Sequence, residues 1–68
     1  MDDSEKAKIR TLLNYWIEHN KEHNDEVMEW AKKARVLGED EACKQMLKAA
    51  QEMDKANESL AQALERLK

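Results

Sequence analysis

The stretch Val36-Leu37-Gly38-Glu39-Asp40-Glu41 decides the fold, because it holds the only glycine of a 68-residue chain that has no proline. A glycine directly after a segment with periodic apolar residues is typical of a left-handed helix stop. Basic residues precede it and acidic residues follow it, which suits the negative end of one helix and the positive start of the next. We therefore predict a helix over about 5–37, a turn at 38–40 and a second helix over about 41–67.

Good helix formers dominate both arms, chiefly Ala, Leu, Glu, Lys, Met and Gln, and charged residues make up 40% of the chain. The β-branched residues are few: Ile9, Thr11, Ile17, Val27 and Val36. The sequence predicts a single all-α domain over residues 1–68.

Apolar residues recur along both arms in alternating steps of three and four. In the first arm the positions are Ile9, Leu13, Trp16, Asn20, His23, Val27, Trp30, Ala34 and Leu37. In the second arm they are Cys43, Met46, Ala50, Met53, Asn57, Leu60, Leu64 and Leu67. These are heptad seams in mirror order, which predicts an antiparallel helical hairpin of the coiled-coil type.

Folding the two seams about Gly38 places Asn20 opposite Asn57. Two facing amides can satisfy each other, and a slip of the helices would leave both unpaired, so this pair would fix the register. The alternative is that one of the two simply points to water. The same folding predicts seven further facing pairs: Ile9 with Leu67, Leu13 with Leu64, Trp16 with Leu60, His23 with Met53, Val27 with Ala50, Trp30 with Met46, and Ala34 with Cys43.

Further apolar residues flank both seams. They are Leu12, Ile17 and Ala31 in the first arm, and Ala42, Leu47, Ala49, Ala56, Ala61 and Ala63 in the second. One partner helix cannot cover so wide an apolar surface. We expect two hairpins to associate as a homodimer in a four-helix bundle. The alternative is a monomeric hairpin with an exposed apolar edge.

The net charge of −3 is scattered along the chain rather than gathered in a basic stripe. This pattern argues against nucleic acid and membrane surfaces as partners. No apolar run approaches the roughly 18–20 residues of a membrane span, so we expect a cytoplasmic protein. We interpret the single cysteine, Cys43, as a small core residue.

The segment Glu18-His19-Asn20-Lys21 is followed at once by the similar Glu22-His23-Asn24-Asp25. Residues four apart share one helix face, so His19 and His23 form a pair of candidate metal ligands. We expect His23 on the seam, in the bundle interior, with support from Tyr15, Glu22 and, across the hairpin, Asp54 or Met53. Two copies of the chain would offer up to four imidazole nitrogens.

Imidazole-rich sites suit Zn, Ni, Cu or Fe, and the sequence does not choose among these metals. The string from His19 to His23 also matches the H-x-x-E-H pattern of some zinc peptidases, but the chain lacks a third ligand and a fold large enough for a substrate cleft. No phosphate-binding glycine loop or Ser-His-Asp set is present. We therefore expect a non-enzymatic metal-binding accessory protein. The alternative is an interaction or structural module, natural or designed, without a ligand.

Residues 15–23 resemble a motif of small prokaryotic helical-hairpin proteins, which reads His-Trp-x-Glu-His-Asn-x-x-His. The matching residues are Trp16, Glu18, His19, Asn20 and His23, and Asn57-Glu58-Ser59-Leu60 resembles an Asn-x-x-Leu stretch in the second helix of that family. The resemblance implies a histidine ladder over three helix turns, which favours metal binding. Tyr15 stands where the first histidine of the motif would be.

Overall fold

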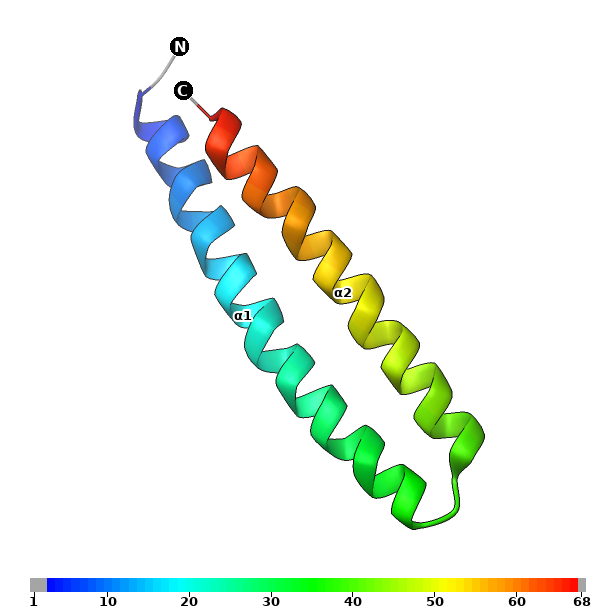
Figure 1. The fold of residues 1–68 in the computed structure, drawn as a ribbon. Helices are drawn as coiled ribbons and strands as arrows, with labels where there is room; N and C mark the ends of the chain where they lie inside the picture. Colours follow the sequence, from blue (N-terminus) through cyan, green and yellow to red (C-terminus); the bar gives the residue numbers. More distant parts are fainter. Residues whose placement is uncertain (1–2, 68) are drawn as a thin grey trace.

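The computed structural model describes residues 3–67 and folds them into two long α-helices joined by a short turn (Figure 1). Helix α1 spans Asp3–Val36 and helix α2 spans Asp40–Arg66. They lie antiparallel and side by side, in a rod with extents of 54 × 14 × 12 Å. The predicted all-α antiparallel hairpin is confirmed. Each helix begins and ends within two residues of its predicted bounds.

The turn between the helices is built on Gly38, whose φ of 81° lies in the left-handed region. The amide of Gly38 donates to the carbonyl of Arg35 at 3.0 Å, and the amide of Glu39 donates to the carbonyl of Ala34 at 2.9 Å. These two bonds form a Schellman motif, which satisfies carbonyls that the end of α1 would otherwise leave unpaired. Glu39 is the N-cap residue of α2, and its side chain makes no capping hydrogen bond.

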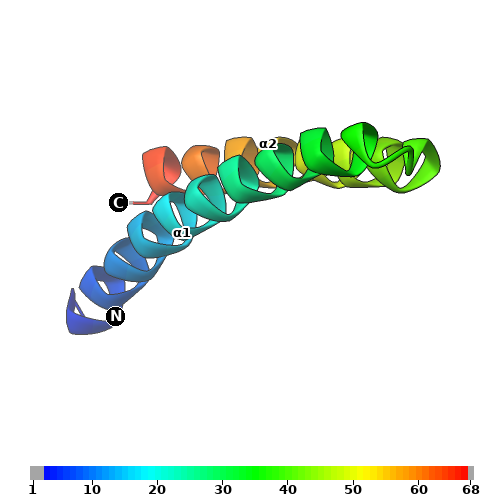
Figure 2. The same ribbon diagram turned by 90° about the horizontal axis from the view of Figure 1, so that it is seen from below.

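The two helices pack along a narrow line of residues, which we call the hairpin seam. Its members on α1 are Leu13, Ile17, Asn20, Asn24, Val27, Ala31 and Ala34. On α2 they are Cys43, Met46, Ala50, Met53, Asn57, Leu60 and Leu64, followed by Leu67 directly after the helix. All of these are buried or half-buried and recur in steps of three and four. Helix α1 curves along its length, as Figure 2 shows.

The predicted seam was right for α2 and half right for α1. Three positions of α1 were assigned one residue too early: the structure buries or half-buries Ile17, Asn24 and Ala31 where we expected Trp16, His23 and Trp30. Ile9 and Leu37, which we also expected in the seam, are exposed. Trp16 is 43% exposed and Trp30 is 55% exposed. The reason is size, because Ala31, with 0% exposure, lets the backbones approach where an indole would hold them apart.

The core of this hairpin is thin. The buried apolar residues are Leu13, Ala31, Cys43 and Ala50, and among residues 3–67 no large side chain is completely buried. Small domains bury a modest fraction of their unfolded surface, and two helices bury less than a bundle does. Neither α1 nor α2, as far as the structure describes them, has an apolar stretch long enough to cross a bilayer.

Candidate metal centre

The two histidines lie one helical turn apart near the middle of α1. Their ring centroids are 5.6 Å apart and the rings meet edge to face, with an interplanar angle of 74°. The ring of Tyr15 stacks on His19 from the preceding turn, with centroids 5.6 Å apart and an angle of 23°. An uninterrupted helix places residues 15, 19 and 23 in one column, so the three rings form a ladder on its surface.

A shallow hollow of about 170 Å³ lies at this ladder and is lined by His19, Glu22, His23 and Glu26. All four side chains are exposed. The hollow combines two imidazoles, which are nitrogen ligands for transition metals, with two carboxylates, which are oxygen ligands. Its lining is therefore chemically suited to a metal ion.

The expected place of His23 on the hairpin seam was wrong. Asn24 takes that position, with 5% exposure, and its side-chain amide donates to Oδ1 of Asp54 at 2.8 Å. His23 is exposed beside the seam instead. Asp54, expected to support the histidines from across the hairpin, accepts the hydrogen bond of Asn24, and Met53 lies in the seam without His23 opposite it.

The described part of one chain does not gather enough ligands for a complete site. Within residues 3–67, no three His, Cys, Asp or Glu side chains are placed so that they could hold a metal ion together. Zinc takes three or four protein ligands, and the histidine pair supplies two. A metal at His19 and His23 therefore needs a further ligand, either from a rearranged carboxylate or from another molecule.

The asparagine pair lies in the same part of the hairpin. Nδ2 of Asn20 donates to Oδ1 of Asn57 at 3.0 Å, and Nδ2 of Asn57 donates to the carbonyl of Ile17 at 3.1 Å. Leu60 is half-buried in the seam one turn further along α2. The register residues expected at Asn20, Asn57 and Leu60 thus lie between the helices, whereas Trp16 and Trp30 do not.

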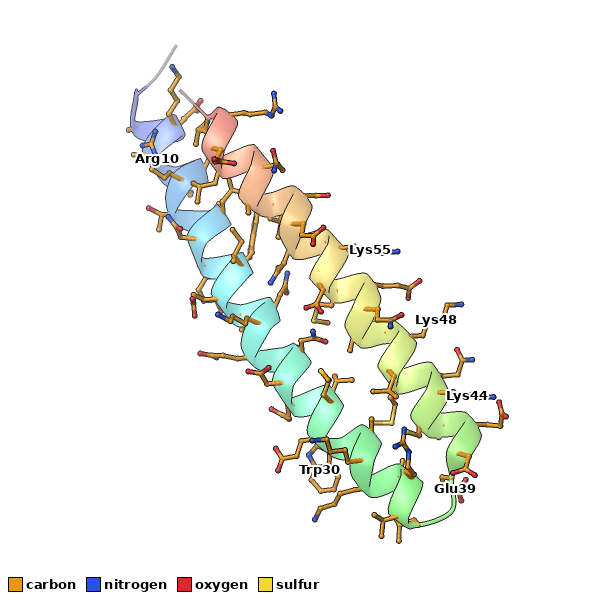
Figure 3. All side chains as sticks on the ribbon, in the orientation of Figure 1. Arg10, Trp30, Glu39, Lys44, Lys48 and Lys55 are labelled. Atoms are coloured by element: carbon orange, nitrogen blue, oxygen red, sulfur yellow. The ribbon has the colours of Figure 1, made fainter. Side chains whose placement is uncertain are left out.

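A second stripe, which the sequence analysis did not separate from the seam, runs along α1. It consists of Ile9, Trp16, His23 and Trp30 and, directly after the helix, Leu37, each seven residues after the last, and all are exposed. Trp30 projects from the surface of α1 rather than into the seam, as Figure 3 shows, and Nζ of Lys33 lies 5.1 Å from the centroid of its ring. The seven-residue spacing was visible in the sequence, but assigning the stripe to the surface required the rotation of α1.

A row of small residues on α2 accompanies this stripe: Ala42, Ala49, Ala56 and Ala63, all exposed. In an antiparallel pair of helices, equivalent heptad positions lie on the same side of the pair. On α1, Trp16, His23 and Trp30 directly precede the seam residues Ile17, Asn24 and Ala31. On α2, the four alanines directly precede Cys43, Ala50, Asn57 and Leu64. The two rows therefore hold equivalent heptad positions and share one side. We call these nine residues the open face. Lys44, Lys48 and Lys55 project from the outer edge of α2 instead (Figure 3).

Comparison with known proteins places the chain in a family. The model of the family described as a domain of unknown function, DUF8180, matches residues 9–67. The chain belongs to the DUF8180 family. The match covers α1 from Ile9 onward and the whole of α2, so the hairpin, the histidine pair and the open face all lie within the DUF8180 domain. No curated protein and no solved structure matches the chain.

Proposed function

We propose that this DUF8180 domain is a non-enzymatic accessory protein that self-associates and binds a transition metal ion through His19 and His23. The observation that carries the proposal is the position of the histidine pair: two adjacent imidazoles, in a hollow with Glu22 and Glu26, at the middle of an apolar face that one chain leaves uncovered. The metal is Zn, Ni, Cu or Fe, all of which accept imidazole ligands.

Two properties of the hairpin support self-association. Its seam buries only a few small and medium-sized side chains, while two indole side chains remain exposed on one side. Exposed apolar patches of this kind mark interaction sites on soluble proteins. Two hairpins that covered each other's open face would form a four-helix bundle, which buries the surface that one chain leaves in water.

The metal component is supported by the incomplete ligand set. A pair of imidazoles one turn apart binds a metal weakly alone, because two of the usual three or four positions stay unfilled. Association of two chains brings further donors to the same place. Metal binding and dimerisation would then stabilise each other, since a ligand that binds only the assembled form favours that form.

A titration with Zn²⁺, Ni²⁺ and Cu²⁺ in turn tests the proposal by isothermal calorimetry, alongside elemental analysis of the protein as purified. We expect stoichiometric binding of at least one ion by the unmodified chain, and its loss in His19→Ala and in His23→Ala. The matched control is Gln51→Ala, an exposed neutral residue of α2. Equal binding by the histidine variants and the control would refute the role of the pair.

The second candidate is an interaction module without a ligand. One observation favours it: the described part of a single chain holds no group of three metal ligands. In that case none of the three ions binds stoichiometrically, and His23→Ala changes only the dissociation constant of the dimer. Sedimentation of the metal-free protein measures this constant, so the two candidates predict different outcomes for the same variants.

A further inference from the structure

We propose that a second copy of the chain packs its α1 antiparallel against the open face, and that Glu26 of this copy completes the site of His19 and His23. The inference rests on the proposed function and extends it, since it names the orientation of the dimer and the missing ligand. It predicts two equivalent metal sites in each dimer, one for each chain.

The first argument is the mirror order of the stripe on α1. From Ile9 to Leu37 the side chains run aliphatic, indole, imidazole, indole, aliphatic, in equal steps around His23. A two-fold interface is self-complementary, so that residue i contacts j and j contacts i. An antiparallel pairing centred at His23 places Trp16 against the second copy's Trp30 and Ile9 against its Leu37. Every apolar member of the stripe then meets another apolar side chain.

Charge decides between antiparallel and parallel pairing, because a parallel pairing would also match the stripe with itself. The charged residues one helical turn from Trp30 are Glu26, which precedes it, and Lys33, which follows it. A parallel pairing puts equivalent residues on opposite flanks of the contact, so it brings no carboxylate to His19, and it aligns the two helix dipoles, which repel each other. The antiparallel pairing sets Glu26 against the second copy's His19 and Lys33 against its Leu12, and it also opposes the two helix dipoles.

The alanine row on α2 fits the same arrangement. When α1 faces α1 about this axis, α2 faces α2, and Ala49 and Ala56 lie between the two copies of α2. Small side chains there allow the second layer to approach as closely as the first. All neighbouring helices of the resulting four-helix bundle are antiparallel, which is the up-down-up-down arrangement.

The ligand geometry follows from the rise of an α-helix. His19 lies four residues before His23, and Glu26 lies three residues after it. In the antiparallel pairing, the second copy's Glu26 therefore falls within about one residue, or 1.5 Å along the axis, of His19. The carboxylate and the imidazole also share the same outer flank of the contact between the helices. Two imidazoles and one carboxylate, with a water, make a complete set for Zn²⁺ and leave one position open.

A complementation experiment with Zn²⁺ tests the shared site. One chain carries His19→Ala and His23→Ala, and the other carries Glu26→Gln. We expect each variant alone to bind Zn²⁺ at least about 10-fold more weakly than the unmodified chain, since even outer-shell groups contribute that much. An equimolar mixture, unfolded and refolded together, regains one tight site per mixed dimer. Glu29→Gln, an exposed carboxylate one turn away, is the control and keeps full binding.

Spin-label distances test the orientation separately, in a Cys43→Ala background without metal. With labels at Asp25 or at Lys8, both exposed, the antiparallel dimer separates the two Lys8 labels by about 45 Å along the axis. The two Asp25 labels are separated by only about 6 Å along that axis, calculated with the same rise per residue. Equal distances at the two sites, or a monomer at every concentration, would overturn the antiparallel dimer.

The two experiments distinguish the possible failures. If the unmodified chain binds no Zn²⁺, Ni²⁺ or Cu²⁺ but gives unequal label distances, the proposed function is wrong and the antiparallel dimer stands. If it binds Zn²⁺ through His19 and His23 but Glu26→Gln binds equally well, the function stands and the shared ligand is wrong. Restored binding in the mixture supports both.

Discussion

Asn20 and Asn57 hold the centre of the hairpin through a directed pair of hydrogen bonds. Nδ2 of Asn20 donates to Oδ1 of Asn57 at 3.0 Å, while Nδ2 of Asn57 donates to the backbone carbonyl of Ile17 at 3.1 Å. Asn57 thus accepts from one residue of α1 and donates to another, one turn earlier. A shift of α2 along α1 would break both bonds at once, so the pair specifies a single register.

Removal of one partner of this pair is predicted to cost more than removal of both. Asn57→Ala leaves the half-buried amide of Asn20 without its acceptor, and we expect a loss of about 1–3 kcal/mol in the free energy of unfolding. The double replacement Asn20→Leu with Asn57→Leu is expected to be neutral or stabilising. Urea denaturation at one fixed protein concentration measures both. Asn20→Leu and Asn57→Leu are also measured singly, and additive effects of these two variants would contradict the coupling.

The Asn24–Asp54 contact predicts opposite effects for its two residues. Nδ2 of Asn24 donates to Asp54, but Oδ1 of Asn24 is buried without a partner among the described residues. Asp54→Ala leaves the amide buried and unpaired, which is expected to cost about 1–3 kcal/mol. Asn24→Leu removes both polar atoms of the buried amide, Nδ2 and Oδ1, and is expected to stabilise the hairpin by about 1 kcal/mol. Urea midpoints test the signs, with Asp25→Ala as the exposed control.

Gly38→Ala is predicted to weaken the turn by about 1 kcal/mol. A Cβ at this position would meet no heavy atom within 4 Å, so the cost comes from the backbone conformation and not from a clash. Asn tolerates the left-handed region better than Ala does, and Gly38→Asn should therefore lose less. Equal stability of Gly38→Ala and the unmodified protein in urea would show that the turn relaxes to another conformation.

Two substitutions separate the hairpin core from the open face. Leu13→Ala removes a side chain that is 6% exposed and is expected to cost about 2–3 kcal/mol, with loss of helical circular dichroism. Trp30→Ala removes an exposed side chain, so the helical signal at high protein concentration should remain. We expect it to weaken the dimer at least about 10-fold, as interface tryptophans do. Sedimentation equilibrium measures this change, and an unchanged dissociation constant would place the interface elsewhere.

The elements and the register of the hairpin were predictable from the sequence. Gly38 marks the turn, and the heptad steps on each side of it predict the two helices. Leu13, Asn20, Val27 and Ala34 belong to the seam under either rotation of α1, so the pairing of Asn20 with Asn57 could be derived before the structure was known.

The rotation of α1 was not predictable from periodicity. Lines of apolar residues through Trp16 and through Ile17 both satisfy steps of three and four, because α1 is apolar on two adjacent stripes. Packing density chooses between them, and it favours the small Ala31 over the large Trp30. The polar match of Asn24 with Asp54 was the sequence signal that could have resolved the choice.

The candidate site was predictable in part for the same reason. A spacing of four places His19 and His23 together on any helix, and their rings do lie side by side. Which side of the hairpin they occupy depends on the rotation of α1, and the structure puts them on the outside. With that rotation, the residue that Asp54 contacts is Asn24.

The thinness of the core sets how the protein responds to temperature. Because none of the large side chains between residues 3 and 67 is completely enclosed, unfolding one hairpin exposes little new apolar surface to water. The heat-capacity change is then small and the enthalpy of unfolding is low, so the stability curve is flat. Heating an isolated hairpin should unwind it gradually over a wide interval, and a sharp calorimetric peak would report the assembled form.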